Sequence, residues 1–440
     1  MKGIKLEKIK EYNNKFYANS QNQVMANVLA NNEMINTIRL SERRPYNRHE
    51  FEIDIKTMTA TNQKNSGRCW IFAALNVLRE IVAKKCDIKE FELSQSFVAF
   101  YDKLEKINYK LENVIELCDR DYDDRTLSCI LSEGIQDGGQ WDMFVNIVKK
   151  YGIVPKSAFD ETYQSSNTRQ MNYVIATKIR QFASIASKLA KDNKKEEIKE
   201  IKEKVLEELY IFLCMNFGVP VEEFDFEYVD SMGNYHLEEN YTPLSFFEKF
   251  VGNSLDEYVS IINAPTEDKP FNKTFTVKYV GNVIDGKEIE YLNLEINEFK
   301  ELCLKQLRDK EVVWFGSDCG KYGDGLGVWD DQMFDYERTF GFSIDIEKGD
   351  MLKYKSSAMD HAMVITGVSF KDNKVSKWKI ENSWGTEKGH NGYYLMSDSW
   401  FDKFVYQAVI NKKYLSKEQL EYLKQEKIAL QPWDPMGTLA

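Results

Sequence analysis

The sequence predicts an α+β protein with a helical first half and a strand-rich last third. Residues 69–84 carry apolar side chains at helical spacing, and the first turns are apolar almost throughout, which predicts a helix buried on most sides. Short alternating or continuously apolar runs predict strands at 288–296, 311–315, 362–370, 375–380 and 392–396. Helices followed by strands along one chain are typical of α+β folds.

Composition narrows the class of protein. The chain has 440 residues, enough for two or three structural units, and a net charge of −11, which argues against nucleic-acid binding. Charged residues interrupt the N-terminus, and no apolar run is long enough to cross a bilayer. Seven cysteines without a CxxC pair favour free thiols in a reducing compartment. We therefore expect a cytoplasmic protein with no membrane partner.

Metal and cofactor motifs are missing from the sequence. It contains no HExxH, no Cys/His cluster at ligand spacing, and no GxxxxGK[ST] or GxGxxG. We expect neither a metal nor a cofactor.

Cys69 stands at the start of the predicted buried helix, directly after Ser66-Gly67-Arg68. The partial positive charge of a helix N-terminus favours a thiolate, which is the nucleophilic form of cysteine. Gln63, six residues upstream, carries a side-chain amide that suits an oxyanion. Taken singly, a structural cysteine and a solvated glutamine are the commoner explanations of these two positions.

His361 is the one histidine of four that immediately precedes an apolar strand; the others are His49, His236 and His390. Asn382 follows another predicted strand, in the turn-like segment ENSWG. If the two strands pair, the carbonyl of Asn382 can fix the tautomer of His361, and Trp384 can shield that bond from water. The alternatives are a hydrogen-bonded structural histidine and a core tryptophan.

The segment Asp137-Gly138-Gly139-Gln140-Trp141 leaves backbone groups unshielded at two adjacent glycines. An extended peptide can pair with such a backbone as an added strand. A simple turn before the predicted helix 141–150 is the alternative.

Five motifs, taken together and in their order along the chain, resemble those of the papain-like cysteine peptidases. They are Gln63, Cys69-Trp70, Gly138-Gly139, Asp360-His361 and Asn382-Ser383-Trp384-Gly385. The segment TNQKNSGRCW (61–70) and the ending PWDPMGTLA (432–440) are similar to one branch, bleomycin hydrolase and bacterial aminopeptidase C. The long separation of Cys69 from His361 also fits this branch, because papain and the cathepsins have only about 130–150 residues there.

The resemblance implies a papain-like fold, with a helical lobe, an antiparallel β-barrel-like lobe and helical insertions. The expected divisions are an N-terminal extension (1–60), the helical lobe (61–165), a mainly helical insertion (166–300), the β-rich lobe (301–425) and a C-terminal arm in the active-site cleft (426–440). The family also implies a homohexamer.

The activity implied is that of an aminopeptidase acting on peptide substrates. Cys69 would be the nucleophile and His361 its base, with Asn382 orienting the base and Gln63 holding the oxyanion. Substrate would contact Gly138, Gly139 and Trp384, and the terminal carboxylate of Ala440 would bind its amino group. Two alternatives are an endopeptidase with an open cleft and a non-enzymatic scaffold that binds nucleic acid.

Overall fold

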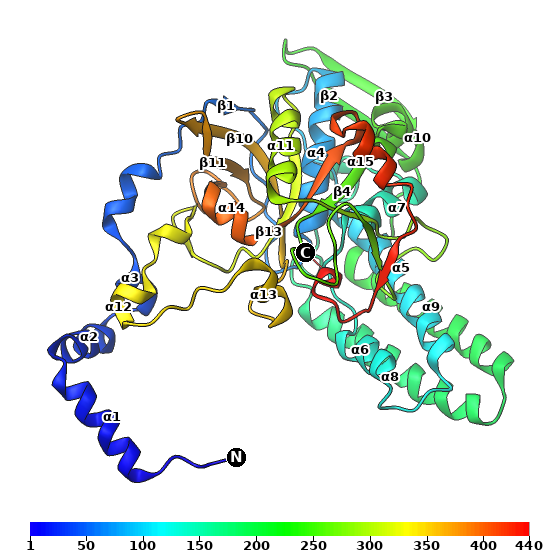
Figure 1. The fold of residues 1–440 in the computed structure, drawn as a ribbon. Helices are drawn as coiled ribbons and strands as arrows, with labels where there is room; N and C mark the ends of the chain where they lie inside the picture. The colour runs from blue at the N-terminus through cyan, green and yellow to red at the C-terminus, as the bar shows by residue number, and fades with distance from the viewer. Residues whose placement is uncertain (440) are drawn as a thin grey trace.

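The structure is a computed structural model that describes residues 1–439. Ala440, predicted to supply the carboxylate, lies outside the described residues. Helices gather in the first half and strands in the second, so the predicted α+β class is confirmed (Figure 1).

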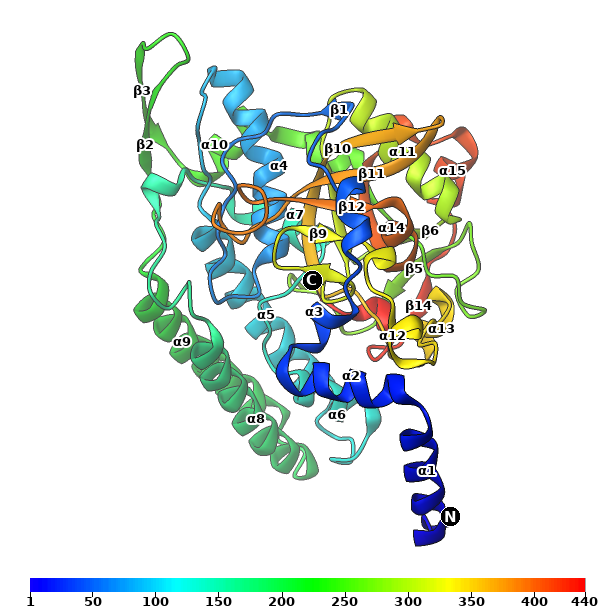
Figure 2. The same cartoon turned by 90° about the vertical axis from the view of Figure 1, so that its left-hand side faces the viewer.

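A helical lobe surrounds the helix that begins at Cys69. Its helices are α4 (Cys69–Cys86), α5 (Gln95–Leu117), α6 (Arg125–Glu133), α7 (Trp141–Tyr151) and α10 (Pro243–Phe250). Two long helices, α8 (Arg169–Lys191) and α9 (Lys195–Phe217), pack against α5 and project from the body (Figures 1 and 2). Helix α4 is buried along most of its length because apolar residues occupy every face of its first turns.

One mixed sheet forms the second half of the molecule. Its order is β14-β5-β6-β4-β13-β7-β10-β11-β12-β9-β8, with β1 paired to β10. The strands are β1 (Ile53–Asp54), β4 (Tyr258–Ile262), β5 (Thr274–Val277), β6 (Tyr291–Asn293), β7 (Val313–Ser317), β8 (Gly323–Asp324), β9 (Val328–Trp329), β10 (His361–Lys371), β11 (Lys374–Glu381), β12 (Tyr393–Ser397), β13 (Val405–Asn411) and β14 (Ile428–Leu430).

The central strands of this sheet are buried on both faces. On β10, Ala362 and Val364 join the core shared with α4, whereas Met363 and Ile365 face a second core. The second core is covered by α11 (Ile296–Arg308) and α14 (Asp398–Phe404). Because side chains alternate between faces, a strand with two cores is apolar at consecutive positions, as the run after His361 is.

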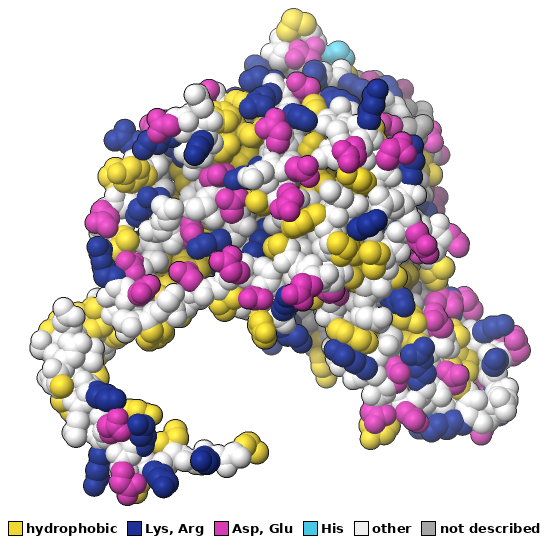
Figure 3. All heavy atoms as spheres, viewed as in Figure 1, with side chains coloured by type: hydrophobic (Ala, Val, Ile, Leu, Met, Phe, Trp, Pro, Cys, Tyr) yellow, Lys and Arg dark blue, Asp and Glu magenta, His cyan; other side chains and the backbone are white. Residues whose placement is uncertain are grey.

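The N-terminal segment leaves the compact body, whereas the C-terminal arm returns to it (Figure 1). Helices α1 (Leu6–Ala18) and α2 (Ser20–Asn31) contain no buried residue and project as a curved segment (Figures 1 and 3). Helix α3 (Met34–Ile38) then packs on α12 (Tyr336–Phe340). Helix α13 (Lys348–Lys353) follows α12, and α15 (Lys417–Tyr422) precedes β14, which pairs in parallel with β5. The arm beyond β14 runs back into the body (Figure 1).

Two features of the middle of the chain were not predicted. Strands β2 (Phe224–Val229) and β3 (Tyr235–Tyr241) form a separate hairpin, in which the rings of Tyr228 and His236 stack at 4.7 Å. Strand β2 alternates packed Phe224, Phe226 and Tyr228 with exposed residues, a period-two signal that the sequence analysis missed, whereas β3 has no such apolar alternation. Strands β4 and β5, also not predicted, lie in the segment expected to be mainly helical, yet they belong to the large sheet; the neighbouring β6 falls within the strand predicted at 288–296. The domain division itself stays a prediction.

Within residues 1–439, no helix combines the length and apolar character needed to cross a membrane. On the face drawn in Figure 3, Lys and Arg side chains are interspersed with Asp and Glu side chains.

Candidate active site

The Cys69 side chain lies where the first turn of α4 meets the start of β10. Cys69 is 2% exposed, and its Sγ accepts a hydrogen bond from the Ala362 N–H at 3.5 Å. Helix α4 packs against β10, so the helix N-terminus is held against the strand that begins with His361. The thiol therefore faces backbone N–H groups, which stabilise negative charge on sulfur.

His361, Asn382 and Trp384 form one cluster at the ends of β10 and β11. These strands are antiparallel neighbours, with Val364 opposite Glu381. The His361 Nε2 lies 2.8 Å from the Asn382 Oδ1, which also accepts the Ser383 N–H. An oxygen that accepts both bonds assigns the proton of His361 to Nε2 and leaves Nδ1 as the basic nitrogen. The Trp384 ring stacks on the imidazole at 4.8 Å.

Burial disfavours charge on either member of the Cys69–His361 pair. It raises the pKa of the Cys69 thiol to about 12, against the opposing effect of the backbone N–H groups of Ala362 and Trp70. It lowers the pKa of His361 to about 4, opposed by the hydrogen bond to Asn382. Burial therefore favours the neutral thiol and the neutral imidazole in this closed site.

Gln63 connects the loop before Cys69 to the loop after Asn382. Its Oε1 accepts the Ser383 hydroxyl at 2.6 Å, and its backbone N–H donates to the Ser383 carbonyl at 2.8 Å. The Gln63 Nε2 donates one hydrogen to the Ser66 carbonyl at 2.7 Å. These bonds fix the side-chain amide beside the start of α4, where the sequence predicts an oxyanion donor.

A buried ion pair joins α4 to the end of β11. Arg79 donates to the Glu381 Oε1 at 2.8 Å, and Asn76 donates to the same oxygen at 2.8 Å. Glu381 immediately precedes Asn382, so this pair ties the helix of Cys69 to the strand that carries Asn382. The sequence analysis missed it; the available signal was Asn76 and Arg79, two polar residues in a helix whose first turns are mostly apolar.

The Gly138-Gly139 segment packs on Trp70, the residue after Cys69. The Trp70 indole donates to the Asp137 carbonyl at 2.7 Å, and a Cβ on Gly139 would lie 2.6 Å from the Trp70 ring. The buried Lys106 donates to the Gly138 carbonyl at 2.6 Å. Glycine is required here because the ring fills the space of a side chain.

The Asp137 carboxylate fixes the same segment from the other side. It accepts the Gly67 N–H at 3.0 Å and pairs with the buried Lys103. Burial acts against ionisation, yet Lys103 and the hydrogen bonds from Thr168 and Asn172 hold the pKa of Asp137 well below its usual range. The sequence analysis also missed Lys103 and Lys106, which are charged residues within the buried surface of α5.

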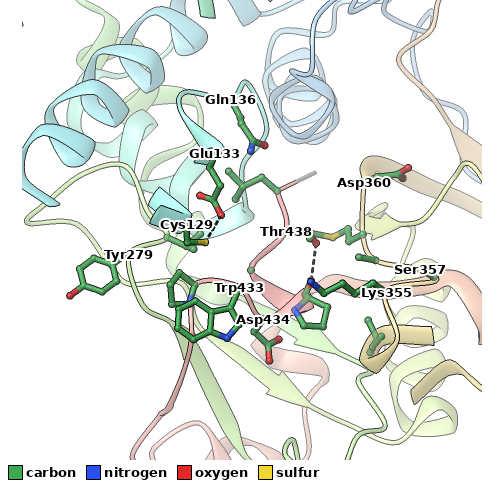
Figure 4. A pocket seen from close by; sticks show the side chains of 18 of the residues that line it. Cys129, Glu133, Gln136, Tyr279, Lys355, Ser357, Asp360, Trp433, Asp434 and Thr438 are labelled. Atoms are coloured by element: carbon green, nitrogen blue, oxygen red, sulfur yellow. Dashed lines mark hydrogen bonds between the residues drawn. The ribbon is translucent and has the colours of Figure 1, made fainter. Parts of the chain in front are cut away.

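The C-terminal arm borders a cavity of about 920 Å³ beside this site. Figure 4 shows Trp433, Asp434 and Thr438 of the arm around the cavity, together with Asp360, the residue before His361. Leu439 lines it as well. The structure thus brings together Cys69, His361, Asn382, Trp384 and Gln63, and it places Gly138 and Gly139 against Trp70. Among residues 1–439, no group of three or more His, Cys, Asp or Glu side chains is arranged to hold a metal.

A cysteine at the start of a buried helix, facing a His–Asn pair on an antiparallel sheet, is the arrangement of a papain-like cysteine peptidase. The chain belongs to the Peptidase C1-like family, which matches residues 3–437. The resemblance to bleomycin hydrolase and aminopeptidase C is confirmed.

Several known proteins are similar over most of this chain. Aminopeptidase C of Lactobacillus delbrueckii subsp. lactis is 46% identical over 395 residues, covering 89% of this chain and 88% of that protein. Bleomycin hydrolase of Mus musculus is 40% identical over 390 residues, covering 86% of each. The crystal structure of PepW from Lactobacillus rhamnosis HN001 superposes with a TM-score of 0.98 at 43% identity, covering 100% of this chain and 99% of that one.

We predict that Gly139→Ala destabilises the protein, because the new methyl group overlaps the Trp70 ring held by Asp137. The expected loss is about 1–3 kcal/mol of the free energy of unfolding, measured by urea denaturation. Gly325→Ala is the matched control, since no atom lies within 4 Å of its Cβ position. Equal stability of the two variants would contradict the packing described for Gly139.

Proposed function

We propose that this chain is a cysteine aminopeptidase that removes N-terminal residues from peptides. The observation that carries the proposal is the C-terminal arm, whose Thr438 and Leu439 line the cavity shared with Asp360, next to His361. The names of the relatives, Aminopeptidase C and bleomycin hydrolase, support it.

In the proposed reaction, the Cys69 thiol passes its proton to the Nδ1 of His361 and attacks the first peptide carbonyl. The negative carbonyl oxygen binds the Cys69 backbone N–H and the second N–H of the Gln63 amide. His361 returns the proton to the nitrogen as the C–N bond breaks, which releases the shortened peptide and leaves a thioester on Cys69. Water, deprotonated by His361, then attacks the thioester carbonyl. The C–S bond breaks, the free amino acid leaves, and the His361 imidazolium returns its proton to the Cys69 sulfur.

The burial of the pair supports this proton transfer as one coupled step. A lone thiolate or a lone imidazolium is disfavoured here, as the directions of both pKa shifts indicate. A thiolate beside an imidazolium is a compensated pair, stabilised by the Ala362 N–H at sulfur and by Asn382 at Nε2.

The arm accounts for the restriction to N-terminal residues. A chain segment already in the cleft blocks peptide residues upstream of the scissile bond. The carboxylate of Ala440 would pair with the free α-ammonium of the substrate, a charge-assisted hydrogen bond in a confined site. Gly138, Gly139 and Trp384 would contact the substrate around that anchor.

Cys69→Ala removes the attacking sulfur, so we expect kcat/KM on an aminoacyl reporter amide to fall by at least about 10³-fold. Cys214→Ser, on α9 and outside the site, is the control and keeps wild-type activity. Retained activity in Cys69→Ala would remove the proposal.

Asn382→Ala removes a hydrogen bond that raises the pKa of His361, so it lowers that pKa. The imidazolium then loses its proton at lower pH. Because the imidazolium protonates the leaving amine, the alkaline limb of the kcat/KM profile moves to lower pH, and the maximum falls by about 10²-fold. Asn216→Ala on α9 serves as the control. An alkaline limb that stays in place or moves to higher pH would contradict the assigned role of Asn382.

Deletion of residues 437–440 tests the arm, because Met436 and its buried contacts remain. We expect kcat/KM on reporters with a free amino terminus to fall and on reporters with a blocked amino terminus to rise. An unchanged ratio of the two would reject the anchoring role of the arm and leave an endopeptidase with an open cleft as the better description.

We also propose a cytoplasmic homohexamer. The exposed apolar side chains of the N-terminal segment, Ile4, Leu6, Ile9, Tyr12, Phe16 and Tyr17, suit contacts between copies. Sedimentation equilibrium should give six times the chain mass of 51.5 kDa, and a monomeric mass would contradict the hexamer. Cell fractionation tests the location, and the acidic net charge weighs against nucleic-acid partners.

A further inference from the structure

We propose that Gln140 is the positioning residue that fastens the end of the C-terminal arm beside Cys69, and so sets the preference for free amino termini. This inference rests on the proposed aminopeptidase function and adds the residue that controls it.

Within the part of the chain that the structure describes, the Gln140 side chain makes one polar contact, and that contact is with the arm. Its Nε2 donates to the Thr438 carbonyl at 2.7 Å, and the residue is 1% exposed. Its Oε1 has no hydrogen-bond partner among residues 1–439. Burying an amide with a single hydrogen-bond partner costs free energy of folding. We therefore assign the bond to Thr438 as the role of this side chain.

Apart from the apolar side chain of Leu439, which packs against the core, the other main contacts of the arm lie further from its end. Lys269 pairs with Asp434 at 2.8 Å, the Arg125 guanidinium lies 3.9 Å from the Trp433 ring centroid, and Met436 is buried in the core. These contacts hold the base of the arm. Within the described chain, the bond from Gln140 to Thr438 is the last hydrogen bond between the body and the arm, and beyond it only the apolar contact of Leu439 with the core remains. Loss of this bond therefore loosens the end of the arm and leaves its base docked.

Gln140 is also rigidly connected to the nucleophile. It follows Gly139, which packs on the Trp70 ring, and it directly precedes α7. Lys106 holds the Gly138 carbonyl, and Trp70 holds the Asp137 carbonyl. The position of Thr438 relative to Cys69 is therefore set through one short segment of fixed backbone.

Two variants remove the donor with little change in size. Gln140→Glu places a carboxylate against the Thr438 carbonyl, and Gln140→Met is neutral. Gln136→Met is the matched control, because Gln136 lies on the same segment and lines the same cavity (Figure 4) but makes no hydrogen bond to the described part of the arm, which ends at Leu439. In both Gln140 variants we expect the ratio of kcat/KM for free over blocked amino termini to fall by roughly three- to tenfold, the effect of one hydrogen bond.

A second readout reports the arm directly. Trimming of the C-terminal residues by a carboxypeptidase, followed by intact mass, should be faster in both Gln140 variants by a similar factor and unchanged in Gln136→Met. Trimming at the wild-type rate, with or without a changed ratio, would overturn the role of Gln140. If deletion of residues 437–440 alters the ratio but the Gln140 variants do not, the inference fails and the aminopeptidase function stands. Trimming could also accelerate while neither the deletion nor the Gln140 variants alter the ratio. Gln140 would then fasten the arm, but the role of the arm in aminopeptidase activity and the control of specificity by Gln140 would both be overturned.

Discussion

The packing of helix α4 against strand β10 is the contact on which the rest of the site depends. It places the first residue of a buried helix against the first two residues of a central strand, so that the Cys69 sulfur meets the Ala362 N–H. Glu381 and Arg79 then tie the same helix to β11, and this places Asn382 beside His361. Residues almost 300 positions apart in the chain are thereby held within hydrogen-bonding distance.

Burial of Cys69 and His361 disfavours their charged forms, and hydrogen bonds within the site partly offset this effect. Burial alone would keep both the thiol and the imidazole neutral, since it raises the pKa of one and lowers that of the other. Backbone N–H groups at the sulfur and the Asn382 carbonyl at the ring act in the opposite direction on each group. In our proposal, the Cys69 thiolate and the His361 imidazolium form in a site where the stabilising N–H and C=O dipoles are already oriented. The same closed site leaves room for substrate only beside the C-terminal arm.

The sequence alone identified the elements that follow local rules. The apolar periodicity after Cys69 predicted the buried helix, and the continuous apolar run after His361 predicted a strand that proves to be buried on both faces. Pairing between the Arg79 and Glu381 side chains, or between Gln140 and Thr438, could not be predicted, because each joins residues about 300 positions apart and has no periodic pattern. The hairpin of β2 and β3 was missed within a segment expected to be mainly helical, although the aromatic and acidic residues of β2 alternate as in a half-buried strand. The ordered set of motifs from Gln63 to Trp384 led to the family, whereas the buried lysines under Gly138 emerged only from the fold.

The most direct test of the account is the mass of the acyl-enzyme intermediate. A peptide of several different residues with a free amino terminus would be mixed with the enzyme, quenched within milliseconds in acid and examined by intact and peptide mass spectrometry. The account predicts a thioester on Cys69 that carries one residue, the N-terminal residue of the peptide. An adduct of two or more residues would contradict the role of the arm, and an adduct on any other side chain would contradict Cys69 as the nucleophile.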